Sequence, residues 1–180
     1  MLYFLISWLW FILPAYFANS SPVFIYGILK KRNYSFHRID FGKDFLDNKP
    51  ILGKGKTFEG SMFGILTGTF IGFLQEVIQK TFNLKFIYPM NIKFAFVMSL
   101  GAIFGDIAES FFKRRMNIER GANLPIFDSI DFVLGTFLFL YIFLHFWDLR
   151  FFLLSLIFTP LIHRLFNIIA YVLGLKEVPW

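Results

Sequence analysis

Three aspartates have the residue type and spacing for divalent-metal chemistry. Asp128 and Asp131 stand three residues apart and share one face of an expected helix, and Asp106 ends an apolar stretch upstream. Carboxylate oxygens are the ligands that hard cations such as Mg²⁺ prefer. The alternative is compensation of a helix dipole, worth about 0.3–1 kcal/mol for each acid, which accounts for one acid better than for two aligned ones. The pattern predicts a metal site at Asp106, Asp128 and Asp131.

Cationic and hydroxyl side chains follow Asp106 on the same expected helix. Ser110 and Lys113 lie on the face of Asp106, and Arg114 comes directly after Lys113. A carboxylate, a hydroxyl and cations at one helix end indicate chemistry on a phosphate.

A second phosphate signal precedes another expected helix. Gly53 and Gly55 lead into Lys56 and Thr57, a combination that can cradle a phosphate at a helix N-terminus. The spacing is not that of a P-loop. A glycine-rich turn in a positively charged cytoplasmic loop is the alternative.

The composition places these residues in a membrane protein. The chain of 180 residues is 57% hydrophobic with 28 Phe, and 17% of its residues are charged. Soluble domains have roughly 45–50% apolar and about 25% charged residues. The net charge of +6 comes from basic residues between apolar blocks, which indicates membrane topology and no nucleic-acid partner. With no cysteine, thiol catalysis and disulfides are excluded.

We expect an all-α, polytopic membrane protein with five transmembrane helices and short loops. A single domain would cover residues 1–180, with a cytoplasmic loop at about 30–56. No Lys or Arg precedes Lys30, so we expect the first helix to be retained rather than cleaved as a signal peptide. The apolar segments are 2–29, 57–79, 92–112, 125–147 and 150–174.

Basic residues predict the orientation. Eight lie between positions 30 and 56 and four between 113 and 120, against four in the other two connections. Because cytoplasmic loops carry an excess of Lys and Arg, we expect the N-terminus outside, and the C-terminus and the polar cluster on the cytoplasmic side.

Glycine and proline residues affect how the expected helices pack and where they bend. Gly60, Gly64, Gly68 and Gly72 recur every four residues, a spacing that lets helices approach closely. The stripe is compatible with a homodimer or with packing inside one chain. Proline at positions 14, 22 and 160 predicts kinks or interruptions. His163 has the character of a packing residue more than of a ligand.

Several motifs, taken in order, resemble those of CTP-dependent phosphatidate cytidylyltransferases, and within that superfamily the CDP-archaeol synthases of the short archaeal branch. The motifs are Lys56-Thr57-x-Glu59-Gly60, Gly105-Asp106 with Ser110-x-x-Lys113-Arg114, and Leu124-Pro125-x-x-Asp128-x-x-Asp131. Branch-specific features are Pro14-Ala15-Tyr16-x-Ala18-Asn19-x-x-Pro22, Ile39-Asp40-Phe41-Gly42-Lys43 and the final Gly174–Trp180 segment. The resemblance covers essentially the whole chain.

The resemblance implies transfer of CMP from CTP to an isoprenoid ether lipid phosphate, a glycerol phosphate with two geranylgeranyl chains. The products would be CDP-archaeol and pyrophosphate, the cofactor Mg²⁺, and the surroundings membrane lipids. It gives catalytic and metal-binding roles to Asp106, Asp128 and Asp131. The residues that it places on the nucleotide and its phosphates are Lys56, Thr57, Glu59, Ser110, Lys113, Arg114 and Arg120.

One departure and two alternative functions accompany this reading. The Lys-Asp pair and His-Gly-Gly run of the larger bacterial enzymes are missing; Arg120-Gly121 and Pro125–Asp128 stand there instead. A small ion-coupled transporter or channel would also have intramembrane carboxylates, but we find no inverted repeat and the acids lie towards one face. A structural scaffold leaves the aligned aspartates unexplained.

Overall fold

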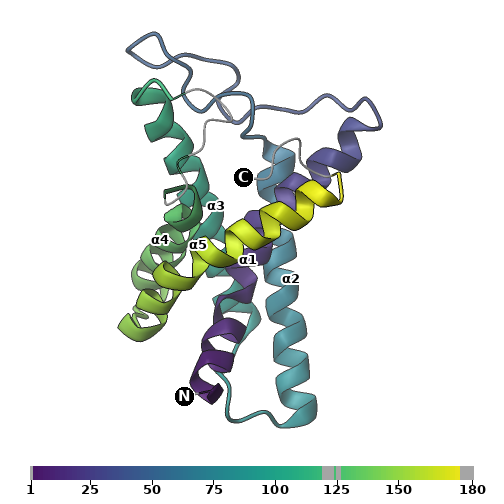
Figure 1. Cartoon of the computed structure of the whole chain (residues 1–180), viewed down its shortest axis with the longest axis vertical. Helices are drawn as coiled ribbons and strands as arrows, with labels where there is room; N and C mark the ends of the chain where they lie inside the picture. Colours follow the sequence, from purple (N-terminus) through teal and green to yellow (C-terminus); the bar gives the residue numbers. More distant parts are fainter. Residues whose placement is uncertain (1, 119–123, 125–126, 175–180) are drawn as a thin grey trace.

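The computed structural model describes residues 2–118, 124 and 127–174, and the described chain contains five α-helices (Figure 1). All five are long and apolar enough to cross a membrane, which confirms the expected all-α polytopic fold. Their bounds are α1 Leu2–Lys30, α2 Phe58–Phe82, α3 Ile92–Arg115, α4 Phe127–Leu144 and α5 Leu149–Val172.

Side-chain caps begin three of these helices. The Thr57 hydroxyl accepts the N–H of Gly60 at the start of α2, and the Asn91 side chain accepts the N–H of Phe94 at the start of α3. Asp148 caps α5 in the same way. Each cap satisfies backbone donors that lack a partner inside the helix, so these starts are fixed locally.

The prolines do not interrupt the helices that contain them. Pro14 and Pro22 lie inside α1, and Pro160 lies inside α5. Of the two predicted outcomes, a kink or an interruption, the interruption does not occur in α1 or α5. Tertiary packing supports the helix at Pro14, whose side chain is fully buried.

The glycine stripe of α2 packs inside the chain. All four of its glycines are buried. A Cβ at Gly64 would lie 2.6 Å from Ile103 of α3 and 2.7 Å from the carbonyl oxygen of Ala18 in α1. Close approach of three helices thus accounts for the stripe, and the homodimer stays a prediction with no support from it.

A second glycine contact joins α3 to α4. A Cβ at Gly101 would lie 2.5 Å from the carbonyl oxygen of Gly135, and one at Gly105 would overlap the carbonyl oxygen of Asp131. The two backbones touch at this level, so Asp131 lies beside the turn of α3 that carries Asp106.

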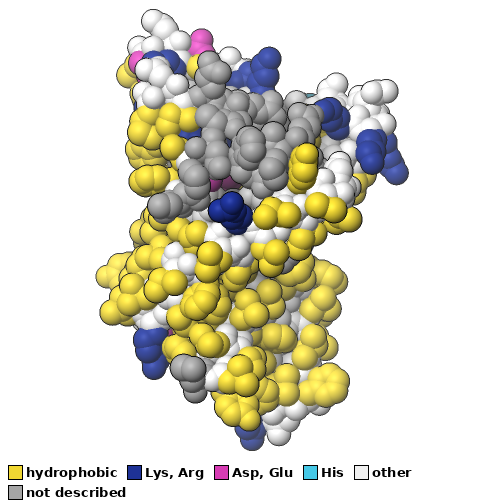
Figure 2. Space-filling model, viewed as in Figure 1, with side chains coloured by type: hydrophobic (Ala, Val, Ile, Leu, Met, Phe, Trp, Pro, Cys, Tyr) yellow, Lys and Arg dark blue, Asp and Glu magenta, His cyan; other side chains and the backbone are white. Residues whose placement is uncertain are grey.

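On the face shown in Figure 2, apolar side chains cover the middle of the molecule, and most of the basic side chains lie towards its two ends. Residues 31–57 connect α1 to α2 and lie at the end opposite the N-terminus, above the C-terminal end of α3 (Figure 1). α5 runs obliquely across the other helices (Figure 1). The polar cluster therefore faces the end of the bundle that residues 31–57 cover.

Candidate active site

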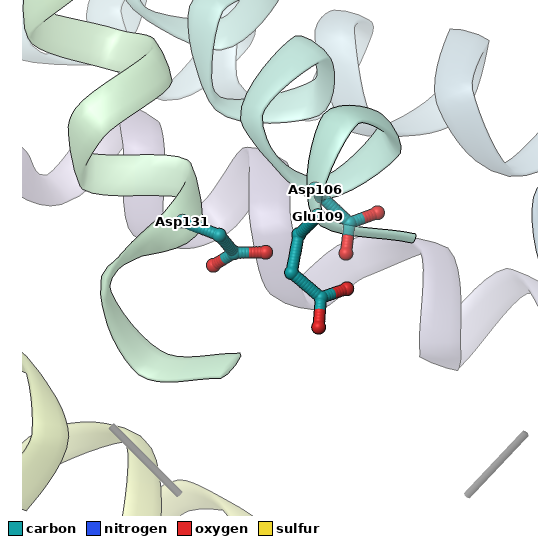
Figure 3. Close-up of side chains that lie close together, drawn as sticks. All are labelled: Asp106, Glu109 and Asp131. Carbon is teal, nitrogen blue, oxygen red and sulfur yellow. The ribbon is translucent and has the colours of Figure 1, made fainter. Parts of the chain in front are cut away.

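Three carboxylates converge between α3 and α4. Asp106 and Glu109 project from successive turns of α3, and Asp131 projects from α4 towards them (Figure 3). One oxygen from each lies within 4.8 Å of the others. This oxygen set, without sulfur or imidazole, fits a hard divalent cation.

Glu109 is absent from the metal ligands predicted from sequence. It stands three residues after Asp106, on the same helical face, and that spacing was the available signal. The sequence could not show which carboxylates point towards Asp131, because this depends on how α3 and α4 pack.

Asp128 is not one of the three converging carboxylates, but it lies beside one of them, Glu109. Its Oδ1 is 2.6 Å from Lys113 Nζ, and its Oδ2 accepts the N–H of Leu124 at 3.2 Å. Lys113 Nζ also lies 2.5 Å from Glu109 Oε1. The ammonium of Lys113 therefore bridges the two acids and neutralises part of their charge.

Lys56 brings the glycine-rich turn to the carboxylates. Its ammonium Nζ lies 2.5 Å from Asp106 Oδ2, and the ammonium is largely buried. Thr57 next to it is buried, and its hydroxyl serves the cap of α2. The turn and the carboxylate cluster thus form one site.

The remaining described residues of the predicted phosphate set lie around α3. Ser110 is buried on this helix. Arg114 lies near the turn, since a Cβ at Gly53 would be 3.9 Å from Arg114 Cδ. Arg120 and the side chain of His163 lie outside the described residues.

Glu59 contacts the loop rather than the carboxylates. Its Oε1 lies 2.6 Å from His37 Nδ1, and its carboxylate accepts the backbone N–H of His37 and the hydroxyl of Tyr34. Burial, the negative charge of Glu59 and the hydrogen bond to it raise the pKa of Tyr34 above its ordinary value. Glu59 orients residues 34–37 and also lines a cavity of about 610 Å³ beside them.

Five membrane-spanning helices with carboxylates and ammonium groups clustered at one end define a multi-pass intramembrane enzyme. The particular family follows from comparison. The model of the CarS-like family, described as CDP-archaeol synthase, matches residues 1–180, and the chain belongs to this family.

Individual relatives agree over nearly the whole chain. The CDP-archaeol synthase of Methanocaldococcus jannaschii is 41% identical over 177 residues, 96% of this chain and 95% of its own length. That of Archaeoglobus fulgidus is 39% identical over 188 residues, covering all of both chains.

A solved structure shares the fold. It was described as an intramembrane enzyme for archaeal membrane lipids biosynthesis. It matches with a TM-score of 0.71 and 31% identity, over 88% of this chain and 91% of that one.

Proposed function

We propose that this chain transfers CMP from CTP to an archaeal di-ether glycerol phosphate, giving CDP-archaeol and pyrophosphate, and that the site between α3 and α4 does this. The chain is a CTP-dependent nucleotidyltransferase by its family. The observation that carries the placement is the convergence of Asp106, Glu109 and Asp131, with Lys56 on Asp106.

The reaction is a displacement at phosphorus. An oxygen of the lipid phosphate attacks the α-phosphorus of CTP, the new P–O bond forms, and the bond to the leaving pyrophosphate breaks. Little covalent chemistry is asked of the protein, so its contribution is positioning and charge neutralisation.

Asp106, Glu109 and Asp131 would hold a divalent cation, and we propose Mg²⁺. When bound, such an ion neutralises phosphate oxygens and orients attacking and leaving groups. Asp128 supports this arrangement by holding Lys113 beside Glu109.

The cationic side chains bind phosphate oxygens in this proposal. Lys56 and Lys113 already lie at the carboxylates, and Arg114 lies beside the glycine turn. Arg120 joins them by its place in the family motifs. A triphosphate brings several negative charges, which these cations offset in a site of reduced dielectric.

The lipid substrate enters from the membrane in this proposal. The apolar helix surfaces accommodate its chains, while its phosphate meets the cluster where α3 becomes charged. The excess of basic residues in the loops at this end supports a cytoplasmic active site and C-terminus, with the N-terminus outside. Cytoplasmic CTP would then reach the site.

The test is a reconstitution assay. Purified protein in detergent with Mg²⁺, CTP and the di-ether lipid phosphate should release pyrophosphate and form CDP-lipid in equal amounts. Absence of both products beside an active relative as positive control would exclude this function. A transporter or channel would give neither product.

The placement of the site is tested by one variant. Asp131→Asn should lower kcat at least about 100-fold, because it weakens the charge stabilisation of the displacement. Asp148→Asn, at the start of α5, removes the same charge away from the site and should keep activity within about twofold of wild type. Full activity of Asp131→Asn would require another site.

A further inference from the structure

The side chain of Asp40 is completely enclosed in the loop between α1 and α2. Its exposed fraction is 0%, although its neighbours Phe41 and Gly42 are exposed. A carboxylate is costly to bury unless donors satisfy its oxygens. Hydrogen-bond donors of the loop must therefore surround this carboxylate.

Backbone and guanidinium donors surround Asp40. Oδ2 accepts the N–H of Leu52 at 3.1 Å and of Gly53 at 2.9 Å, while Oδ1 accepts the N–H of Gly42 at 2.9 Å. The Arg38 guanidinium lies 3.0 Å from both oxygens. Asp40 is thus a buried carboxylate whose oxygens accept hydrogen bonds from several parts of the loop.

The charge of this anion is retained near neutral pH. Burial raises the pKa of Asp40, but the N–H groups of Gly42, Gly53 and Leu52 together with Arg38 outweigh burial. The net result is a pKa below the ordinary value, so the ionised form accepts all of these hydrogen bonds.

Hydrogen bonds beside Asp40 hold the other end of the glycine-rich turn. The N–H of Ile39 donates to the carbonyl of Lys56 at 3.0 Å, and the N–H of Phe58 donates to the carbonyl of His37 at 3.0 Å. Residues 37–40 are therefore hydrogen-bonded to the turn at Leu52–Gly53 and again at Lys56–Phe58. Lys56 lies at the second of these contacts, and its ammonium reaches Asp106.

Arg115 fastens the same loop to α3. Its guanidinium donates to Asp47 Oδ1 at 2.8 Å and to the carbonyl oxygens of Lys49 and Pro50 at 3.1 and 2.5 Å. The guanidinium carbon lies 4.9 Å from the ring of Phe45. The loop is thus anchored to the helix that carries Asp106 and Glu109.

We infer that Asp40 is a positioning residue for the nucleotide: it fixes the glycine-rich turn so that Lys56 meets the triphosphate beside Asp106. This inference rests on the proposed function and adds a residue outside the substrate site. Asp40 acts through Lys56, so its loss affects CTP and leaves the lipid substrate and the helix bundle largely unchanged.

Asp40→Asn is the direct test. The asparagine side chain has one acceptor oxygen only and turns its NH₂ group towards backbone donors. The hydrogen bonds that hold the turn are therefore weakened. The KM for CTP should rise at least about tenfold, with the KM for lipid within about twofold. Asp44→Asn is the matched control, since Asp44 is exposed in the same loop. An unchanged KM for CTP, or an equal rise for both substrates, would overturn the inference.

A double-mutant cycle separates positioning from general destabilisation. In a Lys56→Met background, Asp40→Asn should change kcat/KM for CTP by less than about twofold, because the group that it positions is gone. A penalty of equal size in both backgrounds would show that Asp40 does not act through Lys56.

Hydrogen exchange gives a readout that does not depend on activity. Asp40→Asn should remove amide protection at Leu52 and Gly53, whose N–H groups donate to Asp40, while the five helices keep theirs. If the variant accumulates poorly, Gly53→Ala strains the same turn, since Gly53 has φ +90, and should give the same pattern. Unchanged protection in the turn would overturn the inference. If wild type were inactive but the exchange pattern appeared, the proposed function would fail and the role of Asp40 in ordering the turn would stand.

Discussion

The ammonium of Lys56 lies 2.5 Å from Oδ2 of Asp106, and this contact joins residues that are 50 positions apart in the chain. It links the turn before α2 to the carboxylate cluster on α3 and α4. An ammonium that can bind phosphate and carboxylates that can bind a metal thus lie in the same site, as a metal-assisted transfer from a nucleotide requires.

Replacement of Lys56 by Met should lower kcat/KM for CTP about 100-fold, because the variant lacks a cation aimed at the triphosphate and the ammonium partner of Asp106. Pyrophosphate release at varied CTP measures this change. Lys85→Met is the control, since Lys85 is exposed in the connection between α2 and α3. Activity equal to wild type would remove Lys56 from the site.

Substitutions at Glu109 and at Asp128 should affect the Mg²⁺ dependence of activity differently. Glu109→Gln alters the converging carboxylates and should raise the Mg²⁺ concentration for half-maximal activity at least about tenfold. Asp128→Asn loosens Lys113 and should shift this concentration less than about threefold, while still lowering kcat. Metal titrations at saturating CTP distinguish the two variants. The reverse order would assign the ligand role to Asp128, as the sequence motif predicts.

Gly105→Ala should destabilise the protein and reduce its activity. The added methyl group would overlap the carbonyl oxygen of Asp131, so α3 and α4 must separate at the carboxylate cluster. We expect a loss of about 1–3 kcal/mol, measured by thermal unfolding in detergent.

Gly27→Ala is the matched control for this packing prediction. A Cβ there meets nothing within 4 Å, and the position lies inside α1. This substitution should be neutral or stabilising by up to about 1 kcal/mol. Similar losses for both variants would contradict the close α3–α4 contact.

Asp148 should give α5 a pH-dependent cap. Burial raises its pKa, but the Arg150 side chain and the N–H groups of Phe151 and Arg150 outweigh burial, so the pKa lies below the ordinary value of 3.8. The stabilisation is therefore present above the unfolded pKa and is lost as pH falls through the lower folded pKa.

Asp148→Ala measures the size of this cap. The substitution should cost about 1 kcal/mol between pH 5 and 7, and this difference should shrink below about pH 4. Thermal unfolding at several pH values follows it. A difference that grows with acidity would contradict the assigned ionisation.

Much of the fold could be predicted because membrane helices are encoded locally. Each span needs an apolar run of sufficient length, and backbone groups in lipid must pair within the helix. The expected start of the third helix at residue 92 agrees with α3, whose N-cap Asn91 is adjacent in sequence. The interruption that the sequence allowed at Pro14 does not occur, and the burial of its side chain against the other helices is something a linear pattern does not show.

The sequence predicted that carboxylates form the site, but it predicted only partly which carboxylates lie together. Helical periodicity aligns Asp128 with Asp131, yet it does not state which acid turns towards another helix. The close approach of Gly105 to Asp131 places Asp131 with Asp106 and Glu109, while Asp128 pairs with Lys113. Side-chain direction depends on this helix crossing.

By itself the sequence determined the membrane-spanning helices, the charged end of the bundle and the motifs of the family, because hydropathy and residue spacing act along the chain. Only the tertiary structure decided that Glu109 joins the carboxylates, that Lys56 reaches Asp106 and that Asp40 holds the turn between them. These contacts join distant residues, and their geometry is set by helix packing and by buried hydrogen bonds.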